Sequence, residues 1–76
     1  MPKARGVYAF TRQRRGDFIL FLENDNGVLK FMQLPDCYSV NLTPEEFANG
    51  EKTKLLDFVE QIPEDVFAEA KLNVKP

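Results

Sequence analysis

The pair Asn26-Gly27 constrains this chain more than any other feature of its 76 residues. It lies between two apolar-rich runs, Phe18 to Leu22 and Val28 to Leu34. Asn-Gly between such runs is the strongest short hairpin signal, because both residues of a two-residue turn of this kind need a positive φ. The pair therefore predicts an antiparallel hairpin in which Asp25 lies opposite Val28.

Continuing this register along the two strands predicts one cross-strand pair of opposite charge and two apolar pairs. These pairs are Glu23 with Lys30, Phe21 with Met32, and Leu22 with Phe31. Directly opposed side chains of these types stabilise an antiparallel pair. A slip of one residue would break all three pairs at once, so the pattern favours this register.

The strand-like runs together predict an α+β fold that forms a single domain over residues 1–76. A third run rich in β-branched and aromatic residues precedes the hairpin, and Gly16 can supply the turn between them. Alternation after Pro35 allows one more, half-buried strand. We expect an antiparallel meander of three or four strands, at about 5–13, 17–24 and 28–34, with the optional fourth at 37–42.

Two or three short helices are expected after the meander. Thr43-Pro44-Glu45-Glu46 combines an N-cap residue, a proline at the first helical position and a capping-box glutamate. It predicts a helix over about 44–49 that ends at Gly50. An apolar stripe predicts a second helix over about 52–61, and Pro63 followed by two acidic residues predicts a third over about 63–71.

The alternation of the predicted strands places apolar residues on both faces of the sheet. One face would carry Val7, Ala9, Thr11, Phe18, Leu20, Leu22, Leu29 and Phe31. The other would carry Tyr8, Phe10, Arg12, Ile19, Phe21, Glu23, Val28, Lys30, Met32 and Leu34. An antiparallel sheet normally presents one polar face to water, so both faces of this one need a cover. The cover comes either from a partner or from the remaining segments of the chain.

The second face offers the better candidate surface for a partner, because aromatic and basic side chains lie together on it. The candidate residues are Tyr8, Phe10, Arg12, Phe21, Lys30 and Met32. A second copy of the chain would be the simplest partner. The sequence thus predicts a small non-enzymatic interaction or regulatory protein that acts through protein–protein contact and associates with itself, or with another protein, through one face of its sheet.

The charge distribution supports an alternative function in nucleic-acid binding. The first sixteen residues carry a net charge of +5, and the remaining sixty carry −7. The candidate contacts to a polyanion are Arg5, Arg12, Arg14 and Arg15. Such a basic hairpin, together with the sheet aromatics, could bind a single strand by stacking and phosphate contacts. The isoelectric point near 5.0 is low for such a domain, which leaves this as the second reading.

Catalytic, metal and cofactor sites are not expected. The chain has no histidine, which removes the commonest general base and metal ligand. Its one cysteine, Cys37, lacks a histidine to activate it and cannot form an internal disulfide, so a buried or edge-strand role is expected. No apolar stretch approaches the length of a membrane span, and no membrane contact is expected. A single cysteine fits a cytoplasmic protein.

Overall fold

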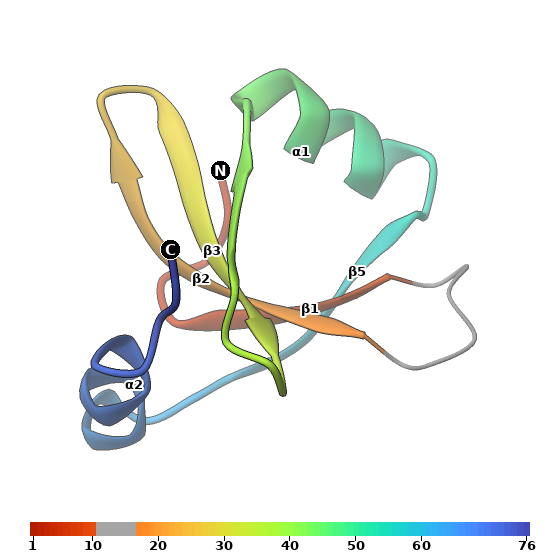
Figure 1. Ribbon diagram of the computed structural model, residues 1–76. Coiled ribbons are helices and arrows are strands. Elements are labelled where there is room, and N and C mark those ends of the chain that lie inside the picture. Colours follow the sequence, from red (N-terminus) through yellow and green to blue (C-terminus); the bar gives the residue numbers. More distant parts are fainter. Residues whose placement is uncertain (11–16) are drawn as a thin grey trace.

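The computed structural model describes residues 1–10 and 17–76 and has the predicted α+β architecture (Figure 1). A five-stranded antiparallel sheet is combined with two short helices. The elements in chain order are β1 (Gly6–Phe10), β2 (Phe18–Asp25), β3 (Val28–Leu34), β4 (Ser39–Leu42), α1 (Pro44–Lys52), β5 (Leu56–Gln61) and α2 (Glu64–Lys71).

The first four strands form the predicted meander, and the fifth strand pairs with β1, at the edge of the sheet opposite β4. The strand order is β4-β3-β2-β1-β5, so β1 pairs with both β2 and β5. The strand expected at 28–34 is confirmed with these bounds, and the optional fourth strand is present but shorter than 37–42. The part of the first expected strand beyond Phe10 lies outside the described residues.

The β2–β3 hairpin has the turn that its sequence predicts. Asn26 has a φ of 51° and Gly27 a φ of 88°, and the Gly27 N–H donates a hydrogen bond of 2.9 Å to Oδ1 of Asn24. Asp25 lies opposite Val28 and Glu23 opposite Lys30, as expected.

The predicted register is wrong beyond Glu23. Phe21 lies opposite Phe31 rather than Met32, and the register shifts between Phe21 and Glu23, which leaves Leu22 as the extra residue of a β-bulge. Because of the extra residue, the β2 residues before the bulge share a face with the β3 residues that were predicted on the opposite face. Phe31 therefore shares a cluster with Phe21, not with Leu22, and the predicted composition of the two faces was wrong for most of β3.

The helix expected at 52–61 was also a wrong prediction. Helix α1 continues to Lys52, and Lys54 then takes a left-handed conformation with a φ of 64°, after which Leu56–Gln61 runs as a strand. This strand pairs along the whole of β1. Pairing with β5 satisfies the main-chain hydrogen-bonding groups on the outer edge of β1, which a helix at these residues would leave unpaired. This long-range pairing overrides the helix that the apolar stripe predicts.

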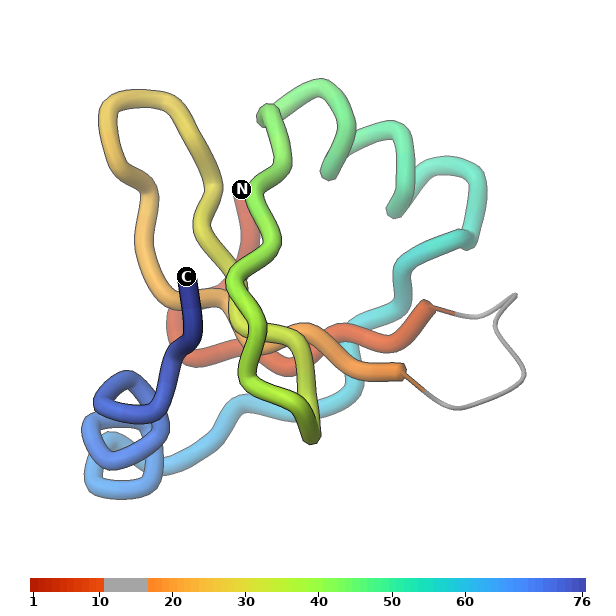
Figure 2. The backbone as a smooth tube through the Cα atoms, viewed as in Figure 1, coloured from red at the N-terminus to blue at the C-terminus, as the bar shows by residue number. Residues whose placement is uncertain are grey.

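Both faces of the sheet are covered by the chain itself, which is the second of the two alternatives above. Helix α1 covers one face, where Phe47 joins a buried cluster with residues of four strands. Helix α2 lies on the opposite side (Figure 2). It packs Phe67 and Ala70 against a smaller cluster of Val7, Leu20 and Met32. The first cluster consists of Tyr8, Ile19, Phe21, Leu29, Phe31, Phe47 and Leu56.

Candidate functional site

The residues predicted to form a partner face do not form one surface. Tyr8 and Met32 are each 1% exposed and Phe21 is 8% exposed, and Met32 belongs to the opposite cluster from the other two. Phe10 is half-buried at the border of the first cluster. Because these side chains already contact this chain's own residues, they are not available together to a partner, and the predicted face is corrected accordingly.

Lys30 and Arg12 complete that predicted set. The Lys30 ammonium lies 2.9 Å from the Asp25 carboxylate, and this hydrogen bond raises the pKa of Lys30. Glu23 lies opposite Lys30 as predicted, but the ion pair forms with Asp25, two residues further along β2. Arg12 lies outside the described residues.

Among the candidate contacts to a polyanion, Arg5 has a structural role. Its Nε donates a hydrogen bond of 2.9 Å to the carbonyl of Ile62, and its Nη1 lies 3.8 Å from a Glu64 carboxylate oxygen. The guanidinium thus joins the start of β1 to the segment between β5 and α2. Arg14 and Arg15, like Arg12, lie outside the described residues.

Tyr8 is enclosed by aromatic and main-chain groups. Its ring meets Phe47 edge-on at 5.1 Å and Phe58 at 5.6 Å between centroids. Its hydroxyl accepts a hydrogen bond of 2.9 Å from the Lys3 N–H, and the Lys3 ammonium lies 4.1 Å from the centroid of the Phe58 ring. Burial raises the pKa of the Tyr8 phenol. In this position Tyr8 supports the core and cannot stack on a nucleobase.

An apolar hollow of the described surface is lined by β5, by α2 and by the strands next to them, and we call it the β5–α2 groove. It has a volume of about 340 Å³. Three of its lining residues are large apolar side chains that are substantially exposed: Phe18 at 37%, Val59 at 48% and Val66 at 49%. Its full lining is Val7, Phe18, Leu20, Leu34, Val59, Glu60, Ile62, Val66 and Ala70.

The local structure explains why the groove stays open. The pairing of β5 with β1 shifts register at the point opposite Val7 and Tyr8, which makes Val59 the extra residue of a bulge. Helix α2 reaches the sheet through Phe67 and Ala70, but none of its residues is fully buried. Val66 lies one position before Phe67 and therefore faces the flank of the helix, where it forms a wall of the groove.

Two carboxylates lie beside this apolar floor. Glu60 lines the groove itself. Glu69 follows Val66 by three residues on α2, so it lies next to the Val66 wall on the helix surface. Both acidic residues are exposed. The groove thus combines apolar side chains below with negative charge at its rim.

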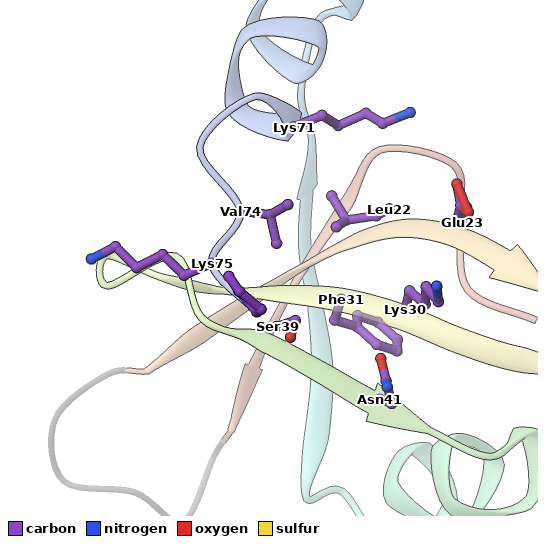
Figure 3. Close-up of a pocket in the computed structure, with 10 residues that line it drawn as sticks. Leu22, Glu23, Lys30, Phe31, Ser39, Asn41, Lys71, Val74 and Lys75 are labelled. Carbon is purple, nitrogen blue, oxygen red and sulfur yellow. The ribbon is translucent and has the colours of Figure 1, made fainter.

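A second hollow, of about 400 Å³, lies between β2, β3, β4 and the C-terminal segment (Figure 3). Lys71 projects above Leu22 and Glu23, whereas the amine of Lys75 points away from the hollow. Lys71 lies over the Phe67 ring at 5.3 Å and Lys75 over the Tyr38 ring at 5.2 Å. Because its lysines are engaged within the chain, this hollow is the weaker candidate for a binding site.

Cys37 lies in the connection between β3 and β4, half-buried against the second cluster. Its carbonyl accepts a hydrogen bond of 2.7 Å from the Lys75 N–H, and the Ser39 N–H donates one of 2.9 Å to the Lys75 carbonyl. These bonds tie the C-terminal segment to the beginning of β4. Over residues 1–10 and 17–76, no group of three or more Cys, Asp or Glu side chains is placed to hold a metal ion. Neither of the described helices is long and apolar enough to cross a membrane.

Sequence reasoning missed the β5–α2 groove because it placed Val59 in a helix. The one local signal that could have found it is Phe58-Val59, an aromatic and a β-branched residue that both favour strands. The strand forms only because it pairs with β1, which is far away in the chain, so the local sequence alone does not predict it.

A scan against protein-family models found no match for this chain, and searches of curated proteins and of solved structures also returned none.

Proposed function

We propose that this chain is a small, non-enzymatic protein-binding module that contacts its partner through the β5–α2 groove. The observation that carries the proposal is the exposure of Phe18, Val59 and Val66 around one apolar hollow. Scattered apolar side chains on a surface need no explanation, but several gathered around a groove are typical of an interaction site.

The position of the groove supports the same function. Each face of the sheet already has a cover from within the chain, so the exposed residues of the groove are not required to close either core. Burying them against a partner would remove apolar surface from water at little cost to the fold. A partner can therefore bind there without the chain having to open.

Binding through the sheet face that the sequence pointed to has less support than binding through the groove. The aromatic residues Tyr8 and Phe21 that would form such a contact, or stack on a nucleic acid, are buried. Protein contact therefore remains the proposed activity, with its location moved to the groove, and nucleic-acid binding becomes an outcome to be tested. The cytoplasmic location expected from the sequence likewise remains a proposal.

Selection from a random peptide library displayed on phage would test the groove, with binding of the selected peptides mapped by NMR on ¹⁵N-labelled protein. Val66→Asp is the test variant, and Val28→Asp is its matched control, because Val28 is similarly exposed at 40% but lies beside the β2–β3 turn. We expect amide shifts around Val59 and Val66, and loss of binding in Val66→Asp only.

Two results would overturn the proposal. The first is a set of peptides whose binding maps away from the groove or survives Val66→Asp. The second is tight, salt-sensitive binding of labelled single-stranded DNA or RNA by a protein that binds no library peptide, because phosphate contacts weaken steeply with salt. That result would favour the nucleic-acid function instead.

A further inference from the structure

We infer that the partner of the β5–α2 groove is a basic protein segment that inserts one apolar side chain between β5 and α2. This inference rests on the proposed function and adds the chemistry of the partner. It follows from the arrangement of charge around the groove, from its size, and from the symmetry that a second copy of the chain would impose.

The charge at the rim selects the partner. Glu60 and Glu69 are exposed carboxylates beside the apolar floor. Lysine and arginine can lay their aliphatic stems along apolar surface while their charged groups reach a carboxylate at its edge. A segment with such residues on either side of an apolar one would match both parts of the groove, and charge complementarity would set its orientation and its rate of association.

The size of the groove fits a single large anchor. Its volume is about 340 Å³, and it is partly open to solvent. For comparison, an engineered apolar cavity of about 150 Å³ holds benzene. A phenylalanine or leucine side chain can therefore enter, in contact with Val59 on one wall and Val66 on the other.

A second copy of this chain fits the groove poorly. In a twofold dimer the same patch of both copies meets, so each residue of the rim approaches the rim of the other copy. The two carboxylates of one copy would then approach the two of the other, and like charges brought together in this way are destabilising. An acidic lipid surface or a nucleic acid is disfavoured for the same reason.

Three blocked pentapeptides would test the inference. The probe has a central phenylalanine flanked by two lysines on each side. One control replaces the lysines with glutamates, and the other replaces the phenylalanine with glycine. NMR titration of the ¹⁵N-labelled protein should show binding of the probe at residues 59–70, little binding of the glycine control and none of the glutamate control. Raising the salt from about 0.02 M to about 0.5 M should weaken probe binding, because these rim charges are exposed.

Two double variants separate local from overall charge. The test variant carries Glu60→Gln and Glu69→Gln. The control variant carries Asp36→Asn and Glu45→Gln, which changes the net charge equally at exposed positions away from the groove. We expect the test variant to bind the probe about fivefold more weakly than the unmodified protein, the combined effect of two exposed ion pairs, and the control variant to bind it within about twofold. Equal weakening in both variants would overturn the inference.

The library selection separates failure of this inference from failure of the proposed function. Library peptides that bind the groove but lack basic residues would overturn the inference and leave the proposed function intact. Failure of both the library and the probe would overturn both. Self-association that Val66→Asp abolishes would assign the groove to a second copy, which also overturns the basic partner.

Discussion

The two helices cover opposite faces of one sheet in different ways. Helix α1 begins at a complete capping box, in which the Glu46 N–H donates to the Thr43 hydroxyl and the Thr43 N–H donates to the Glu46 carboxylate. It buries Phe47 to 1% exposure. Helix α2 follows Pro63, has no side-chain cap, and contains no buried residue.

The difference shows how a small chain can close one core tightly and leave a groove beside the other. Phe47 lies against the rings of Tyr8 and Phe31, so α1 completes the larger core. Helix α2 only rests on the smaller cluster through Phe67 and Ala70 and leaves its Val66 side open. In this comparison α1 supplies stability, and α2 supplies the wall of a groove.

The largest expected effect is at Phe47. Phe47→Ala should lower the free energy of unfolding by about 3–5 kcal/mol, because it removes a fully buried aromatic ring and leaves a cavity. Phe67→Ala on α2 should cost about 1–1.5 kcal/mol, because that ring is only half-buried. Urea denaturation of the two variants measures both values. Equal losses would remove the distinction between the two helices.

The capping residues give the next contrast. Thr43→Ala should cost about 1 kcal/mol, because it removes the hydrogen bond to the N–H of Glu46. Pro63→Asp should instead stabilise α2 slightly, by adding a cap where the helix has none. Thermal unfolding followed by circular dichroism compares the pair, and a stability gain in Thr43→Ala would contradict the role given to the capping box.

Gly50 tests how closely α1 approaches β5. A Cβ at this position would lie 2.8 Å from Cδ1 and 3.1 Å from Cγ of Leu56, so Leu56 would have to move. We expect Gly50→Ala to destabilise by about 1 kcal/mol in spite of the higher helix propensity of alanine, because overpacking outweighs it. In α2, the exposed Ala68→Gly should follow propensity alone and lose about 1 kcal/mol. A stabilised Gly50→Ala protein would show that the contact is loose.

The smallest expected effect is a pH dependence of the stability, which comes from Tyr8 in the core under α1. The pKa of Tyr8 is raised above its ordinary value of 10.0, chiefly by burial. A raised pKa favours the neutral phenol in the folded state, so its contribution to stability is complete below pH 10.0 and is lost as the pH rises through the folded pKa. Urea midpoints at rising alkaline pH should fall more for the native protein than for Tyr8→Phe. Parallel curves would mean that the phenol is solvated.

The parts of the fold that local chemistry specifies could be predicted from the sequence. Asn26-Gly27 requires positive φ at both turn residues, and Thr43 to Glu46 contains a whole capping box, so the hairpin and the start of α1 needed no tertiary information. Leu56–Gln61 could not be predicted in the same way, because its apolar spacing is compatible with a helix and only β1 decides for a strand. The candidate site failed for a related reason: Tyr8, Phe21 and Met32 were expected on one face, and the bulge at Leu22 separates them.

The sequence by itself determined the α+β class, the antiparallel meander and the need for cover on both faces of the sheet, because these depend on turn residues and on the alternation of neighbouring side chains. Only the tertiary structure decided that the chain supplies both covers, that β5 is a strand, and that an acidic-rimmed groove stays open beside α2. Those outcomes depend on which segments pair and pack although they are far apart in the chain. The periodicity of a single segment does not show which distant segment it will contact.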